Sequence, residues 1–268
     1  MKSSILSGRT LAVCVGTAAI AFASFAMTGG EVAVSAQAPQ GGGRQGGPPP
    51  TPQAGAAIDL TGNWVSVVNE DWRWRMVTPP KGDYASVPLT NRGRELADQW
   101  QPSNDGQCQA YGVGGIMRMP TRVRVSWQDP NTLKLEMDAG TQTRLIHFDD
   151  NAQVPTARSL QGFTRGEWER PGGGRRGAPP PPGGNLKATT TMHTAGWLRK
   201  NGVPYTENAE IVEYFDRFDA PNGDQWFTVT TIVTDPEVLN QPFVTSSHFK
   251  KEADGSKWAP STCRQAGT

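Results

Sequence analysis

The last third of the chain constrains the fold most strongly, because it contains four consecutive segments in which apolar and polar residues alternate. β-branched and aromatic residues at every second position, separated by Asn-Gly and Asp-Pro breaks, are typical of antiparallel strands. Several segments carry large side chains on both faces, as in a sheet that closes around an interior and is also covered outside. The pattern therefore predicts an all-β barrel or sandwich. The four predicted strands are Leu186–Thr194, Glu210–Asp219, Gln225–Thr234 and Phe243–Lys251.

One helix interrupts this β-rich pattern, over Leu89–Gln101. Thr90 can cap it, Leu96 and Trp100 lie four residues apart, and Pro102 follows. We expect it to lie across an end or a wall of the β structure. Further alternating segments predict strands at Ile58–Val68, Arg122–Gln128, Thr132–Asp138, Gln142–Phe148 and Gly162–Glu169.

The N-terminus has the layout of a secretory signal peptide. A basic start precedes an apolar run over Leu11–Met27, and small residues lead to a cleavage site after Ala36. The alternative is a retained membrane anchor, although the run is short for a spanning helix. We expect a signal peptide over residues 1–36 and a periplasmic or secreted protein.

Two segments are too rich in Pro and Gly to bury a core. Residues 37–56 predict a disordered tether, and residues 171–184 predict a disordered loop within the sheet. The folded β-barrel domain is therefore predicted over residues 57–268.

The charge balance argues against a polyanionic partner. Removing the predicted signal peptide takes two of 26 basic and one of 25 acidic residues, so the mature chain is formally neutral. No basic patch indicates nucleic acid or an anionic membrane surface. We expect no nucleic-acid binding and no stable membrane insertion after signal cleavage.

Cys108 and Cys263 are the two cysteines of the predicted mature chain. In an oxidising compartment, an even pair in one domain predicts a disulfide. This disulfide would close a loop of about 155 residues, for which chain entropy gives a stabilisation of about 5 kcal/mol. The alternatives are two free thiols or a metal-binding pair.

Gly62-Asn63-Trp64, at the start of the first predicted strand, resembles the Gly-x-Trp motif of the lipocalins, or calycins. A broader resemblance covers nearly the whole mature domain. In it the chain is similar to a group of exported bacterial proteins in the blocks GNWVSVV, EDWRWRMVTPPKGDY, CQAYGVGGIMRMP, WQDPNTLKLEMDAGTQTRLIHF, GWLRKNGVPYTENAEIVEYF and TTIVTDPEVLNQPF. The resemblance implies an antiparallel lipocalin-like (calycin-like) β-barrel, of about eight to ten strands with one short helix. It carries over no catalytic residues.

Glu70–Tyr84 is the most unusual stretch of the sequence. If it is extended, its two tryptophans fall on one face and its two arginines on the other, before a Pro-Pro turn. One interpretation is an amphipathic strand with the tryptophans in the core. The other is a barrel mouth, where indoles offer apolar surface to a ligand and arginines lie at the rim. The predicted ligand-binding residues are Trp72, Arg73, Trp74, Arg75, Tyr84 and Tyr214.

Glu213 and His193 are the predicted catalytic residues, if the protein is an enzyme. Glu213 falls on the face of Ile211 and Phe215, where apolar surroundings would raise the pKa of a carboxyl group and suit it to proton transfer. The alternative is an outward-facing charge paired with Arg217. No serine has the context of a nucleophile, so covalent hydrolysis is not expected.

The three histidines, His147, His193 and His248, each lie within a predicted strand. Three converging imidazoles could bind zinc or copper, but no short ligand spacing supports such a site. We therefore expect no metal site and no cofactor.

These observations favour an exported binding or carrier protein for a small apolar molecule. The alternatives are a cofactor-independent isomerase, hydratase or lyase on the same barrel, and an accessory subunit of an envelope complex with an unidentified protein partner. A pocket with an isolated Glu or His would favour the enzyme. An apolar cavity would favour the carrier, and a filled barrel the accessory subunit.

Overall fold

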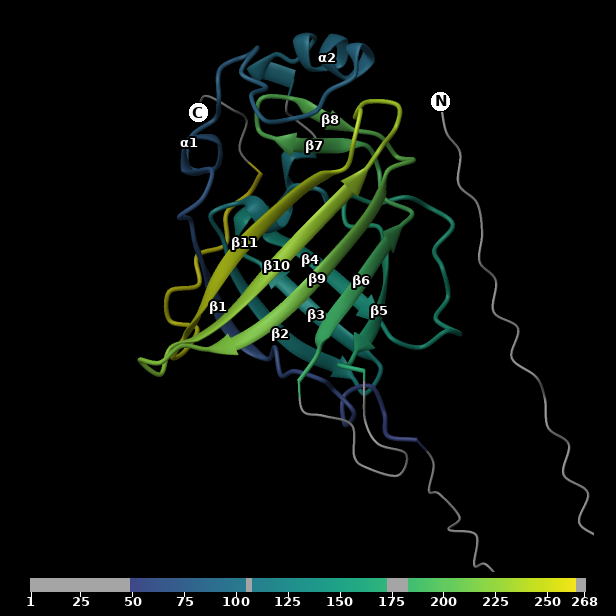
Figure 1. The fold of residues 1–268 in the computed structure, drawn as a ribbon, viewed down its shortest axis with the longest axis vertical. Helices are drawn as coiled ribbons and strands as arrows, with labels where there is room; N and C mark the ends of the chain where they lie inside the picture. Colours follow the sequence, from purple (N-terminus) through teal and green to yellow (C-terminus); the bar gives the residue numbers. More distant parts are fainter. Residues whose placement is uncertain (1–48, 105–107, 173–182, 264–268) are drawn as a thin grey trace, which may run out of the picture. The chain divides into compact units, whose positions relative to one another are not determined.

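The computed structural model describes residues 49–104, 108–172 and 183–263. Nine strands in these ranges close into one barrel, which confirms the predicted barrel and excludes a sandwich. The strands are β1 (Gly62–Val67), β2 (Arg122–Asp129), β3 (Thr132–Met137), β4 (Gln142–His147), β5 (Phe163–Glu169), β6 (Asn185–Thr191), β9 (Glu210–Asp219), β10 (Gln225–Thr234) and β11 (Phe243–Glu252). Their order around the barrel is β1-β11-β10-β9-β6-β5-β4-β3-β2 (Figure 1).

The barrel is antiparallel, as predicted, except at one joint, which makes it mixed. Strands β4 and β5 are parallel and pair at only two positions, Ile146 with Thr164 and His147 with Arg165. Parallel neighbours need a long connection that returns the chain to the same end of the sheet. Residues 148–162 provide it, and alternation within the strands does not reveal this change of direction.

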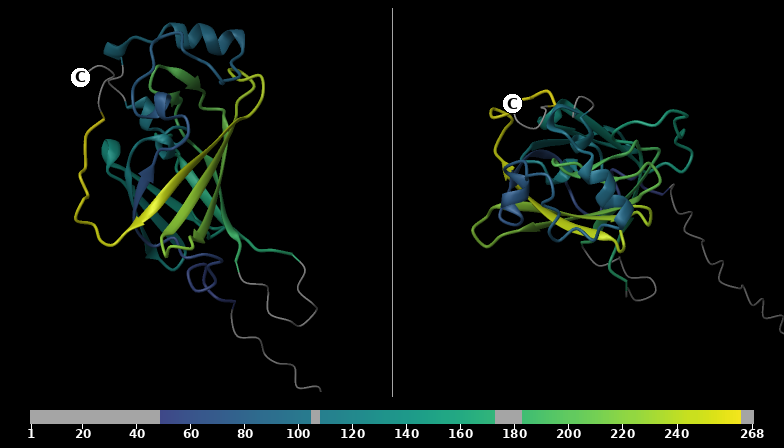
Figure 2. Two further views of the ribbon diagram at one scale, coloured as in Figure 1. Left: turned by 60° about the vertical axis from the view of Figure 1, so that its left-hand side comes forward. Right: turned by 90° about the horizontal axis from the view of Figure 1, so that it is seen from above.

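The remaining elements gather mainly at one end of the barrel, opposite the end where residues 49–57 lie (Figures 1 and 2). Strands β7 and β8 form a separate two-stranded sheet there, and α2 packs against β8. These elements are α1 (Trp72–Arg75), α2 (Asn91–Asp98), the 3₁₀ turns η1 (Pro102–Asn104), η2 (Gln109–Tyr111), η3 (Ile116–Arg118) and η4 (Ala139–Thr141), and the strands β7 (Gly196–Arg199) and β8 (Val203–Tyr205).

Helix α2 is the predicted helix in shortened form. The Thr90 hydroxyl caps it by accepting the Gly93 N–H at 3.0 Å. Trp100 lies beyond its end but is buried, with its ring edge towards Trp197. The sequence predictions lack the β7–β8 hairpin, although Asn-Gly at Gly202 is a common hairpin turn and the positive φ of 80° there favours glycine.

Packed apolar side chains fill the barrel interior. Trp64 is fully buried, its indole N–H donates to the Leu60 carbonyl at 2.8 Å, and its ring meets Phe227 edge-on. The Lys251 ammonium lies 5.4 Å from the Trp64 ring centroid. Beside these residues the core leaves no space that a water molecule could occupy. The side chains around this point are Leu60, Val125, Leu133, Leu135, Leu186, Phe215 and Phe227.

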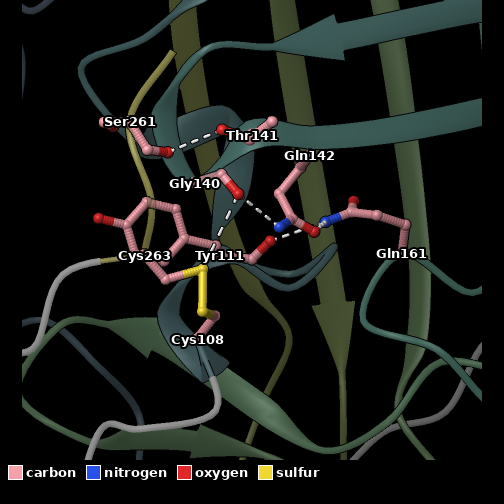
Figure 3. The surroundings of a disulfide bond; sticks show 8 residues. All are labelled: Cys108, Tyr111, Gly140, Thr141, Gln142, Gln161, Ser261 and Cys263. Carbon is pink, nitrogen blue, oxygen red and sulfur yellow. Dashed lines mark hydrogen bonds between the residues drawn. A yellow bond between two sulfur atoms is a disulfide. The ribbon is translucent and has the colours of Figure 1, made fainter.

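The predicted disulfide between Cys108 and Cys263 is confirmed, with the two Cα atoms 5.3 Å apart (Figure 3). It joins the residue before η2 to the C-terminal segment. The same segment is held beside η4, because the Thr141 hydroxyl donates to the Ser261 carbonyl at 2.9 Å. The disulfide thus fixes the chain end to loops that connect the barrel strands.

Part of the predicted tether contacts the barrel. The Trp168 indole N–H donates to the Pro52 carbonyl at 2.9 Å, and the Gln53 amide donates to the Pro130 carbonyl at 3.1 Å. The rest of the tether, the predicted signal peptide over residues 1–36 and most of the predicted loop over 171–184 lie outside the described residues. Within the described ranges, no helix is both long enough and apolar enough to cross a membrane.

Candidate functional site

Trp72 and Trp74 lie on the short helix α1, so the prediction that Glu70–Tyr84 is extended is wrong at this point. The helix is closed by backbone bonds from Arg75 to Asp71 and from Met76 to Trp72. Helical geometry separates residues that alternation would place on one face. Trp72 is accordingly 63% exposed, whereas Trp74 is half-buried.

Arg75 is buried below α1 rather than exposed at a rim. Its guanidinium forms an ion pair with Glu70, donates to the Arg118 carbonyl at 2.8 Å and lies 3.3 Å from the Ser66 hydroxyl. Burial lowers the pKa of Arg75, and the Glu70 carboxylate opposes that shift. Glu70 also contacts His248, with 3.1 Å between Oε2 and Nδ1.

Arg73 and Trp74 are joined through Asp83. The Asp83 carboxylate accepts from the Arg73 guanidinium at 2.5 Å and from the Trp74 indole N–H at 3.1 Å. The hydrogen bond from Arg73 is the main cause of a lowered pKa at Asp83. The Arg73 guanidinium also lies 4.7 Å from the Trp74 ring centroid. These contacts orient the Trp74 ring.

Two further arginines approach α1 from distant parts of the sequence. Arg118, at the end of η3, forms an ion pair with Asp71 at 3.2 Å. Arg199, at the end of β7, is 3% exposed and lies 4.4 Å from the Trp74 ring centroid. We call Arg73, Arg75, Arg118 and Arg199 the arginine cluster.

A narrow crevice is lined by Trp74 and by three arginines of the cluster, Arg75, Arg118 and Arg199. Its free volume is about 10 Å³, close to the space needed by one water molecule. Lys200 also borders it, and burial lowers the pKa of that lysine. The full lining is Trp74, Arg75, Gly115, Arg118, Met119, Leu198, Arg199 and Lys200.

Exposed apolar side chains lie on the outer side of α1 and just after it. Trp72, Met76 and Val77 are 63%, 53% and 57% exposed, respectively. We call these three residues the apolar shelf. Large apolar residues that cluster on a surface, rather than occurring singly, are typical of a binding site.

The two predicted tyrosines lie elsewhere. Tyr84 is buried against α2, and its hydroxyl donates to the Asp98 carboxylate at 2.8 Å. Burial, together with Asp98, raises the pKa of Tyr84 to about 12. Tyr214 alternates with the inward-facing Glu213 and Phe215 on β9, so it lies on the outer face of the barrel wall. The structure does not bring Tyr214 into the arginine cluster.

Glu213 faces the barrel interior, as its position between Ile211 and Phe215 suggests, and is fully buried. It forms an ion pair with Arg144 of β4, which is 1% exposed. The alternative pairing with Arg217 is wrong, because Arg217 lies 2.8 Å from Asp219 instead.

Two threonine hydroxyls complete the surroundings of Arg144. The guanidinium donates to Thr164 at 3.1 Å and to Thr190 at 2.9 Å. The sequence analysis missed Arg144, although in its predicted strand it falls on the same face as the buried Ile146. Its place on the inward face of the strand, two residues before Ile146, was the sequence feature that could have predicted a buried arginine.

His193 is also buried, but with different partners from those of Glu213. Its two ring nitrogens lie 3.1 Å from the Thr194 carbonyl and 2.9 Å from the Ala209 carbonyl. Proton transfer by either residue would need an opening that exposes it to a substrate. The catalytic role of Glu213 and His193 stays a prediction.

The three histidines have separate surroundings. His147 stacks on Phe163 at 4.9 Å, and burial lowers the pKa of His147. His193 lies between two backbone carbonyls, and His248 lies beside Glu70. Across the described ranges, no three potential ligand side chains come together in a way that could hold a metal ion.

A larger groove lies near the end of the barrel where the N-terminal segment packs. Its volume is about 830 Å³, and it follows the wall near the β4–β5 joint. Phe148 and Trp168 stack at 5.1 Å along it. The charged residues that border it are Asp150, Arg165, Glu167, Arg170 and Lys187.

Comparisons with protein families, curated proteins and solved structures found no match to this chain. The closed nine-stranded barrel is compatible with a lipocalin-like fold. Because no relative assigns a function, the function of the α1 region has to be inferred from the side chains that the arginine cluster and the apolar shelf present. Arg118 and Arg199 are the residues that sequence reasoning missed, and the available signal was a single arginine within each of the apolar segments GIMRMP and GWLRK.

Proposed function

We propose that the protein is an exported binding protein for a small, largely apolar molecule, and that the ligand binds outside the barrel, on the apolar shelf. The observation that carries the proposal is the simultaneous exposure of Trp72, Met76 and Val77. Three exposed apolar side chains beside one four-residue helix offer contact area that the monomer itself does not bury.

The filled interior argues against a ligand inside the barrel and, by the criterion stated from the sequence, favours the accessory subunit; a carrier must therefore bind its ligand on the outside. Small barrels hold a ligand only when side chains leave a cavity. Here Phe215, Phe227 and their neighbours close the centre. The proposed site therefore keeps the predicted location at one end of the barrel and keeps Trp72 and Trp74 as contact residues, but it does not extend into the interior.

A neutral fluorescent apolar dye such as Nile red tests the proposal. We expect saturable binding that is lost in a Trp72→Ala, Met76→Ala double variant that still folds. Phe218→Ala is the matched control, because Phe218 is 47% exposed but lies on β9. Dye binding that survives the double variant would contradict the proposal, and its loss in the control would place the ligand near Phe218 instead.

A second candidate function, an accessory subunit, is favoured by the large groove. Part of the N-terminal segment, Pro50, Thr51 and Pro52, already forms one wall of it. A photo-crosslinking amino acid at Lys187, inside the groove, should then capture one defined partner in intact cells. The same amino acid at Thr228, on the outer face of β10, is the control. Equal capture of many proteins from both positions would exclude the groove as a docking site.

A further inference from the structure

The charges in the arginine cluster do not balance. Three arginines of the cluster each have one carboxylate partner. Asp83 pairs with Arg73, Glu70 with Arg75 and Asp71 with Arg118. Arg199 has no carboxylate partner among the described residues. An arginine that is 3% exposed and unpaired is unfavourable, since a buried charge normally requires a counter-charge.

The hydrogen-bonding groups of Arg199 are also incomplete. Its Nε and Nη1 atoms are buried and have no acceptor within the described part of the chain. The Trp74 ring interacts with the guanidinium, but a ring contact does not accept a hydrogen bond from these N–H groups. Burial and the nearby Arg118 charge lower the pKa of Arg199 to about 10, which reflects the same lack of compensation.

We propose that the crevice lined by Trp74 and Arg199 binds a small oxyanion, a carboxylate or an inorganic oxyanion. The anion would accept hydrogen bonds from the unpartnered Nε and Nη1 of Arg199 and would interact with the positive charges of Arg118 and Lys200, which line the same crevice. It would supply the counter-charge that the chain itself does not provide.

Access to this crevice requires the Trp74 ring to move. The free volume of about 10 Å³ admits roughly one water molecule, so a carboxylate must displace the indole. Because Glu70 and the Arg118 carbonyl hold Arg75 in place, the movement must come from the Trp74 side chain, whose indole N–H has one hydrogen bond, to Asp83 at 3.1 Å.

The same ligand can be an organic acid with an apolar body, and this extension rests on the proposed function. Trp74 borders the crevice, and the apolar shelf lies on the same helix and the two residues after it. Because no residue of the apolar shelf lines the crevice, a chain attached to the bound carboxylate would have to extend past Trp74 to reach Trp72. Inorganic oxyanions would use the crevice alone.

Benzoate and benzyl alcohol are matched probes, because they share the ring and differ in the charge. We expect benzoate and sulfate to bind the full mature protein saturably and to change its tryptophan fluorescence, and benzyl alcohol to bind more weakly. Arg199→Met should weaken benzoate at least about tenfold, the factor expected for loss of charged hydrogen bonds. Arg92→Met, at a site 54% exposed on α2, should leave benzoate binding unchanged.

Thermal unfolding separates ligand binding from a structural role. Arg199→Met without anions should melt at the wild-type temperature or above it, since it removes an uncompensated charge. A clearly lower melting temperature would indicate a structural arginine and overturn the proposal. Equal benzoate affinity in wild type and Arg199→Met, or binding of neither benzoate nor sulfate to wild type, would also overturn it.

Two results distinguish this proposal from the proposed function. If Nile red binding persists and no anion binds, the oxyanion site is wrong and the apolar site stands. If anions bind normally while the Trp72→Ala, Met76→Ala variant still binds the dye as wild type does, the apolar site is wrong and the oxyanion site stands. Should Arg199→Met not fold, Arg199→Lys gives the same test, with sulfate affinity in place of the melting comparison.

Discussion

The barrel interior and the α1 end both bury arginines, but at the α1 end one of them, Arg199, lacks a carboxylate partner among the described residues. Inside, Arg144 has the Glu213 carboxylate and two threonine hydroxyls, and only its Nη1 lacks a partner in the described residues. At the α1 end, Arg199 has an aromatic ring and no carboxylate. A buried charge that is paired within the chain, such as Arg144, needs nothing else for the protein to fold stably. A buried charge that has no partner within the chain, such as Arg199, indicates that a ligand from outside the chain supplies the counter-charge.

The largest effect is expected in the interior. Glu213→Gln should lower the free energy of unfolding by about 3–5 kcal/mol, because it leaves the Arg144 charge buried and unpaired. The free energies of unfolding of wild type and variant can be measured by urea denaturation, with tryptophan fluorescence as the signal. Replacing both partners, Arg144→Met with Glu213→Leu, should recover most of the loss. A Glu213→Gln variant as stable as wild type would remove the contrast between the two regions.

The disulfide should stabilise the end of the barrel near η2 and η3 by a smaller amount. Cys263→Ser should lower the free energy of unfolding by about 2–4 kcal/mol, because it frees the C-terminal segment from the loop that leads to η2 and η3. This is less than the chain-entropy value of about 5 kcal/mol, because measured disulfides usually stabilise by less than that model gives. Arg118 lies on η3, so oxyanion binding should weaken in this variant as well. Adding reductant should lower the stability of wild type and leave Cys263→Ser unchanged. If reductant lowered the stability of both proteins equally, the Cys108–Cys263 disulfide would not be the source of the stabilisation.

Tyr84 should make the α1 end sensitive to alkali. Its pKa is raised from 10 to about 12, so between these pH values the unfolded chain loses the phenolic proton while the native protein keeps it. The stability that comes from this difference is therefore full below pH 10 and is lost as the pH rises towards 12.

Tyr84→Phe removes this proton and the hydrogen bond to Asp98, so the decline between pH 10 and 12 should be shallower than in wild type. Chemical denaturation at several pH values provides the measurement. Parallel curves for the two proteins would show that Tyr84 does not titrate in this window.

The smallest effect on stability is expected on the apolar shelf. Trp72→Ala should change the free energy of unfolding by no more than about 0.5 kcal/mol, because the side chain is 63% exposed. A loss above about 2 kcal/mol would mean that Trp72 is part of the core and that the shelf is not a free surface.

The sequence predicts the regular part of the fold well. Strands β9 and β10 have the predicted bounds, because their inward and outward faces differ at every step and a one-residue shift would expose the core face. The same rule fails at Trp72–Arg75, where alternation suggests an extended segment. There the ion pair of Arg75 with Glu70 and its bond to the Arg118 carbonyl hold a helical turn instead. Tertiary contacts of this kind override the secondary-structure preference of the local sequence.

The candidate site was predictable only in part. The segment with Trp72 and Trp74 attracts attention because it concentrates indoles and guanidinium groups. Arg118 and Arg199 reach it from elsewhere in the chain, and each is an isolated arginine in its local sequence. Nothing in local spacing indicates that they converge, because their approach depends on how η3 and β7 cover the barrel end.

The pairing of β1 with β11 has a consequence for how the molecule forms. Asn63 lies opposite Glu252, so the hydrogen bonds that close the barrel join the first and last strands of the described residues. The ribosome must release the polypeptide through residue Glu252 before this closure can occur. Until then, β1 and β10 both present unpaired backbone edges, which favour association with other chains. Contacts of such long sequence separation also make folding slow. We therefore expect chains truncated before β11 to aggregate rather than to fold partly.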